Sequence, residues 1–125
     1  QASPLDGLGP VTTAEAVLEA QRAVRKVRVS PEMEDYLLEV VAATRTAQGV
    51  VLGASPRAAL ALERFAQALA ALEGRDYVIP DDLKDAVFPV LGHRLILAYE
   101  ARLEGLTPES VLHVILERVP VPVES

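Results

Sequence analysis

The sequence predicts an all-α domain, a small bundle of about five helices with a minor two-stranded β element. Half of the 125 residues are hydrophobic, and this half is mainly Ala, Leu and Val, with no Trp, two Phe and three Tyr. An aliphatic, alanine-rich composition favours close-packed helices. Five segments begin with a helix-start signal and continue with apolar residues at helical spacing. The length suits one domain with its own core.

The first two predicted helices begin with common capping patterns. Thr12, with Glu15 three residues later, has the spacing of a capping box and opens a helix that runs to about Lys26. Ser30-Pro31-Glu32 opens a second helix, which is expected to end near Gly49. Its apolar face is predicted to consist of Met33, Leu37, Val40, Val41 and Thr44.

The other three predicted helices each begin at a proline. Ser55-Pro56 opens the third, which Gly74 closes, and Pro80-Asp81-Asp82 opens the fourth. Pro89 is expected to kink or end the fourth helix, because proline lacks the backbone donor. Thr107-Pro108-Glu109 opens the fifth. The predicted apolar stripes are Leu62, Phe65, Leu69 and Leu72 on the third helix, and Val111, Leu112, Ile115 and Leu116 on the fifth.

Four segments outside the helices complete the predicted organisation. Residues 27–29 and 94–99 are β-prone and are expected to pair as the two-stranded element. Residues 1–11 are rich in Pro and Gly and are predicted to be a linker. Residues 120–125 are predicted to be an extended tail, because Pro120 and Pro122 each remove a donor. The helical domain would then span residues 12–119.

Composition and charge argue against several classes of function. Without cysteine there can be no disulfide and no thiolate metal site, and two histidines alone do not predict a metal centre. The net charge of −6 is unfavourable for nucleic-acid binding, which depends on neutralising phosphates. No apolar run approaches the roughly 20 residues of a membrane span, and the first residues do not have the pattern of a signal peptide. A cytoplasmic protein is expected.

One helix start departs from the charge pattern of the others. Three of the four helices that open with proline have an acid as the next residue, Glu32, Asp81 and Glu109, which suits the partial positive charge of a helix N-terminus. The third helix has Arg57 there instead, at a cost of about 0.3–1 kcal/mol relative to an anion. A guanidinium beside N-terminal amides could bind an anion such as phosphate. A solvated arginine, or one paired with a nearby carboxylate, explains the pattern equally well.

A series of motifs extends the evidence beyond this single arginine. The segment Gly53-Ala54-Ser55-Pro56-Arg57-Ala58 resembles the sensor 2 motif of MoxR-type AAA+ ATPases. Further matches follow the order expected for that family, and the resemblance spans about residues 12–122. Two departures are Ile79, where the family usually has a capping Thr or Ser, and Gly92, which replaces a larger polar residue. The further matching segments are Val41-Ala42-Ala43-Thr44-Arg45, Gly74-Arg75-Asp76-Tyr77-Val78, Pro80-Asp81-Asp82-Leu83 and Val90-Leu91-Gly92-His93-Arg94.

The resemblance implies the all-helical lid of an AAA+ ATPase, joined through the linker to an N-terminal ATPase core. Arg57 would sense the γ-phosphate of ATP, on its own subunit or on a neighbour in a ring oligomer, and Ser55 and Pro56 would form the helix start that presents it. Arg45 and Arg75 recur in the family pattern and could bridge the lid to the core or to the next subunit. The alternative for both is a cation that the dipole favours near a helix C-terminus.

The resemblance also implies which functions belong to the parent protein and which to this chain. The parent would use ATP and Mg²⁺ and perform chaperone-like remodelling or assembly of partner proteins, although the motifs identify no client. The 125 residues contain no G-x-x-x-x-G-K-[ST] loop, so the chain alone is expected to have no catalytic residues, no ATPase activity and no tight cofactor binding. Two other classes stay open: a stand-alone helical adaptor with an apolar groove for a partner peptide, and a helix-turn-helix DNA binder, which the charge disfavours.

Overall fold

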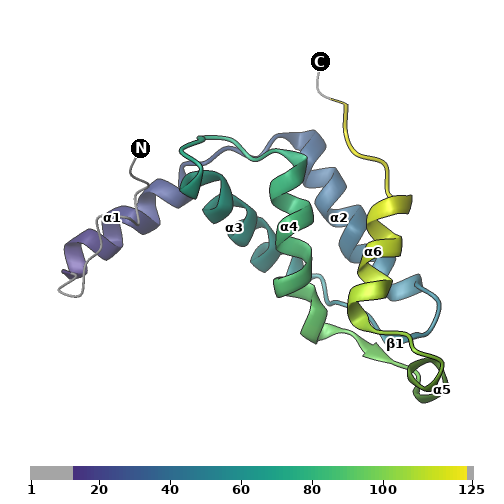
Figure 1. The fold of residues 1–125 in the computed structure, drawn as a ribbon. Coiled ribbons are helices and arrows are strands. Elements are labelled where there is room, and N and C mark those ends of the chain that lie inside the picture. Colours follow the sequence, from purple (N-terminus) through teal and green to yellow (C-terminus); the bar gives the residue numbers. More distant parts are fainter. Residues whose placement is uncertain (1–12, 124–125) are drawn as a thin grey trace.

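The computed structural model describes residues 13–123, and this part of the chain confirms the predicted all-α fold with a small two-stranded sheet (Figure 1). Five of its helices correspond to the five predicted ones. The additional helix, α5, is only five residues long and too short to produce a periodic pattern. The elements are α1 (Ala14–Arg25), α2 (Pro31–Thr46), β1 (Val50–Leu52), α3 (Arg57–Leu72), α4 (Pro80–Leu91), the 3-10 helix η1 (Gly92–Arg94), β2 (Ile96–Leu97), α5 (Tyr99–Leu103) and α6 (Pro108–Arg118).

The bundle consists of α2, α3, α4 and α6, with α3 and α4 packed along each other. Helix α1 projects to one side, and the β strands lie with α5 at the opposite end (Figure 1). The predicted apolar faces of α2 and α6 are buried as expected, except that Leu116 is only partly buried. No helix among residues 13–123 is long and apolar enough to cross a membrane. The largest fully buried side chains include Met33, Leu37, Leu62, Leu83, Leu91 and Leu112.

The predicted buried stripe of α3 is partly wrong. Leu62 is fully buried, but 38% of Phe65 and 43% of Leu72 is exposed. The buried face consists mainly of small residues, because alanines allow the neighbouring helices to approach α3 closely. The buried residues of α3 are Ala58, Ala59, Leu62, Ala66, Gln67, Ala70 and Ala71.

The helix ends differ in detail from the predicted ones. Helix α1 is capped by Thr13, whose hydroxyl accepts the N–H of Ala16 at 3.0 Å. Thr12 and the predicted linker, residues 1–11, lie outside the described residues. Helix α4 does not end at Pro89 but continues for two more residues to Leu91, where the 3-10 helix η1 follows.

The predicted pairing of the β-prone stretches is wrong. Strand β2 does lie within residues 94–99, but it pairs antiparallel with β1, the segment between α2 and α3. Residues 27–29 lie instead beside residues 76–78, where the N–H of Arg28 bonds to the carbonyl of Asp76 at 2.8 Å. Short strands pair with whichever segment the helix packing brings alongside them, and local β propensity does not specify that partner.

Candidate functional site

Arg57 is exposed at the first position of α3, where Pro56 was predicted, because Pro56 is the N-cap residue of this helix. The residue before it, Pro56, already has helical backbone angles. The first turn is closed by the main chain: the N–H of Ala58 bonds to the carbonyl of Ser55 at 2.9 Å, and that of Ala59 to Pro56 at 3.1 Å. Ser55 therefore shapes the helix start through its carbonyl, and α3 has no side-chain cap. With these amides in use, the guanidinium is the principal group that Arg57 offers to an anion.

The guanidinium of Arg57 has no carboxylate partner within residues 13–123. The two ion pairs in this part of the chain are Arg28–Asp76 and Arg75–Asp82. The first turn of α3 also contains no acid, whereas α2, α4 and α6 each have one or more there. The arrangement therefore leaves an exposed cation at a helix end where cations are disfavoured.

The segment that leads to Arg57 is fixed to the last turn of α2 by the backbone N–H and the backbone carbonyl of Ala54. The N–H of Ala54 donates to the Thr44 hydroxyl at 2.9 Å, and the Ala54 carbonyl accepts from Nε of Arg45 at 3.1 Å. Ala54 is 1% exposed and Thr44 is fully buried, so the bond between these two residues is shielded from water, whereas the bond from the exposed Arg45 is only partly buried. Thr44 in turn donates to the carbonyl of Val41 at 2.6 Å. Arg45, predicted as an interface residue, thus holds the site segment in place.

Gly53 allows this close contact between the segment and α2. A Cβ atom at Gly53 would lie 2.6 Å from the carbonyl oxygen of Thr44 and 2.7 Å from the backbone nitrogen of Arg45. Both are main-chain atoms of a helix and cannot move aside without disturbing it. The position therefore requires glycine because of the close approach of two backbones.

Arg75 is not brought near Arg57, because the two residues flank opposite ends of α3. A helix of this length spans about 24 Å. The Arg75 guanidinium forms two hydrogen bonds with the Asp82 carboxylate, at 2.6 and 2.8 Å, which raise the pKa of Arg75. The same carboxylate accepts the N–H of Ile79 at 2.9 Å, so Asp82 caps α4 although Ile79 has no capping oxygen. Arg75 therefore joins the end of α3 to the start of α4.

The solvent-facing side of α3 continues from Arg57 and is unusually apolar. It carries Ala61, Arg64, Phe65, Ala68 and Leu72, at helical spacing. Two arginines and no carboxylate lie on this side, although the whole chain has a net charge of −6. This surface was not expected from the sequence, because the helical spacing of Phe65 and Leu72 predicted both in the core.

The one acid of α3 is Glu63, on a different side of the helix from Arg57. It is partly buried, and its pKa is raised, mainly by burial and then by the nearby Glu34 of α2. Glu63 therefore lies beside Glu34 of α2, although the positive charge of the neighbouring Arg64 partly offsets the rise in its pKa.

Comparison with known proteins gives matches over most of the chain. Residues 42–115, from within α2 to within α6, match the family of AAA lid domains. The chain is 41% identical to the uncharacterized protein YeaC of Bacillus subtilis over 97% of its own length, and 37% identical to Chaperone MoxR1 of Mycobacterium tuberculosis over 85%. It spans only 38% and 30% of those two proteins. A crystal structure of a candidate ATPase from Cytophaga hutchinsonii superposes with a TM-score of 0.83 at 36% identity, over 90% of this chain and 37% of that one.

Proposed function

The chain is an AAA lid domain of the MoxR family, and on this basis we propose that it is the sensor 2 lid of an AAA+ ATPase in which Arg57 contacts the γ-phosphate of ATP. The observation that carries the proposal is the exposed guanidinium of Arg57, which has no carboxylate partner among residues 13–123. A planar guanidinium binds phosphate oxygens through paired, charge-assisted hydrogen bonds.

The anchoring of the Arg57 segment supports a sensing role. Thr44 and Arg45 fix Ala54, so a force on Arg57 is passed through a short segment to α2 and the core of the lid. When hydrolysis removes the γ-phosphate, Arg57 loses its partner, and the equilibrium position of the lid shifts by the free energy of that contact. The nucleotide state is thereby converted into a movement of the whole lid.

The exposed side of α3 supports docking on the ATPase core. Phe65 and Leu72 lie on the same side of the helix as Arg57, and Arg64 adds a second positive charge. An apolar side without acids is suited to contact with another protein surface. The nucleotide would lie at the Arg57 end of this contact. ATP and Mg²⁺ would be held by the core, since this chain supplies only the arginine.

The parent protein would use this movement to remodel or assemble partner proteins, as a ring of subunits in the cytoplasm. The similarity to a protein named a chaperone supports that role. In this proposal residues 12–119 form the lid, residues 1–11 connect it to the core, and residues 120–125 form a tail.

The proposal is tested by steady-state ATP hydrolysis in the intact ATPase. Arg57→Ala is expected to lower kcat by at least about tenfold, because an arginine that contacts the γ-phosphate commonly contributes more than that. Arg25→Ala is the matched control, since Arg25 is an exposed arginine on α1. An unchanged rate in Arg57→Ala would remove that residue from the proposed role.

A further inference from the structure

A groove of about 850 Å³ opens between the last turn of α2, the short helix α5 and helix α6. Apolar parts of its walls are formed by Ala43 from α2, Ala47 just after α2, Ala101 from α5, and Val111 and Val114 from α6. Val114 is 43% exposed, so its side chain is available to an occupant. The volume lies within the range of roughly 300–1,000 Å³ that is usual for binding pockets.

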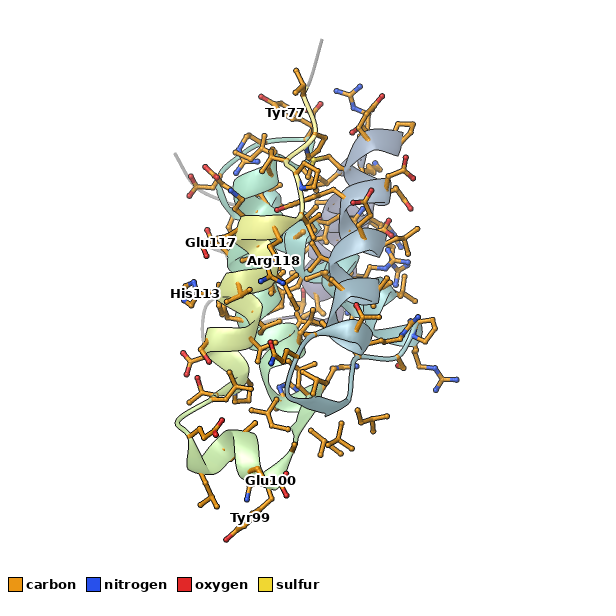
Figure 2. The ribbon with its side chains drawn as sticks, turned by 90° about the vertical axis from the view of Figure 1, so that its right-hand side faces the viewer. Tyr77, Tyr99, Glu100, His113, Glu117 and Arg118 are labelled. Atoms are coloured by element: carbon orange, nitrogen blue, oxygen red, sulfur yellow. The ribbon has the colours of Figure 1, made fainter. Side chains whose placement is uncertain are left out.

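The charged side chains along the groove have opposite signs at its two ends. Glu100 lies on α5 and Glu104, four positions later, is the C-cap residue of that helix, whereas Arg118 lies in the last turn of α6. Figure 2 shows Arg118 between α6 and α2, and Glu100 at the α5 end. None of the three belongs to an ion pair within residues 13–123. Two like charges one turn apart destabilise a helix slightly, so a basic group of an occupant would relieve that repulsion.

The framework of the groove is held in place before anything binds. Gly49 has φ +86°, and its carbonyl accepts the N–H of Ala98 at 2.8 Å, which ties the end of α2 to the start of α5. A Cβ atom at Gly49 would lie 2.5 Å from Cδ2 of Leu106 and 3.2 Å from Cβ of Ala101. The loop therefore packs directly on the α5 region, and binding needs little reorganisation.

We propose that this groove binds a segment of a partner protein that carries apolar side chains and at least one basic side chain. The apolar side chains would pack on Val114 and its neighbours, and the basic one would pair with Glu100 and Glu104. A second copy of this chain is disfavoured as the occupant, because it brings a net charge of −6 to the end of the groove that carries Glu100 and Glu104. The proposal does not depend on Arg57, since neither Arg57 nor Thr44 and Arg45, which hold its segment, line the groove.

The test uses a phage-displayed library of random peptides selected on the chain, with Val114→Asp as the counter-selection. We expect enriched peptides to combine apolar residues with Lys or Arg. Their affinity should fall at least about tenfold in Val114→Asp, because truncating or charging a central apolar contact costs on this order. The control Leu38→Asp should bind as the unchanged chain does, since Leu38 is 52% exposed on α2 outside the groove. Circular dichroism establishes that both variants fold.

A double variant tests whether binding requires the two acids. Replacing both acids, Glu100→Gln and Glu104→Gln, should weaken the basic peptides about twofold to tenfold and abolish their preference over versions with Lys changed to Glu. Several outcomes would overturn the proposal: enrichment that is independent of Val114, selection of acidic peptides, no enrichment at all, or self-association of the chain that Val114→Asp abolishes. The last outcome would assign the groove to a second copy.

Discussion

The buried hydroxyl of Thr44 accepts the backbone N–H of Ala54 at 2.9 Å, across ten positions of sequence. This bond joins two segments that the sequence presents as separate motifs, the end of α2 and the stretch that leads to Arg57. Arg45 completes the junction by donating to the carbonyl of the same residue. The position of Arg57 is therefore determined by the core of the lid and not by its own helix alone.

Removing the Thr44 hydroxyl should destabilise the domain. Thr44→Val keeps the shape of the side chain but leaves the buried N–H of Ala54 without an acceptor, at a cost of about 1–3 kcal/mol. Thr46→Val is the matched control, because Thr46 is exposed and its hydroxyl makes only a 3.5 Å contact with the carbonyl of Ala43. Urea denaturation measures both free energies of unfolding. Equal values for the two variants would contradict the importance of the Thr44 bond.

A methyl group at Gly53 should also be costly. Gly53→Ala would place Cβ against main-chain atoms of Thr44 and Arg45, and overpacking of this kind costs about 1–3 kcal/mol. Gly92→Ala is the control, because a Cβ there meets nothing within 4 Å and the backbone is helical. That variant should be neutral or more stable by up to about 1 kcal/mol. Thermal unfolding that ranks the two variants the other way would show that the Gly53 contact is not tight.

Glu63 should make stability depend on pH. Burial and the nearby Glu34 raise the pKa of Glu63 in the folded chain, so the folded state holds that proton more tightly than the unfolded state. Its contribution is full below the unfolded pKa of about 4.3 and is lost as the pH rises through the raised value. Glu63→Gln mimics the protonated group and should stabilise the chain at pH 7, by at most about 1 kcal/mol.

The difference between Glu63→Gln and the unchanged chain should shrink as the pH falls through the raised pKa of Glu63, and it should be gone below the unfolded pKa of about 4.3. Glu39→Gln, an exposed position on α2, serves as the control. Denaturant unfolding at a series of pH values measures the difference. A destabilised Glu63→Gln at pH 7, or an advantage that grows in acid, would show that Glu63 is better ionised in the folded state.

The helices were predictable where local chemistry decides them. Proline at the first position and a nearby acid locate the first residues of α2, α4 and α6. The buried face of α3 was not predictable in this way. The apolar spacing predicts Phe65 and Leu72 in the core, but the residues that pack there are mainly alanines. Apolar periodicity shows which apolar residues share one side of a helix. It does not determine which side of an alanine-rich helix faces inward.

The candidate site, like the helices, was predictable only where a local rule decides. Arg57 stands out by a local rule, the charge preferred at a helix start. The partners of Arg45 and Arg75 are Ala54 and Asp82, and both contacts depend on how a loop returns to a helix end. The groove beside α6 was not foreseen either, because α5 is too short to give a helical pattern.

The most direct test of the central claim compares the affinity of the intact ATPase for ATP and for ADP. If Arg57 contacts the γ-phosphate, Arg57→Ala should weaken binding of a non-hydrolysable ATP analogue by about tenfold to a hundredfold, the worth of hydrogen bonds to a charged group. Binding of ADP should stay the same, and Arg25→Ala should change neither affinity. Equal weakening of both nucleotides, or no change in either, would contradict the assignment of Arg57 as the γ-phosphate sensor.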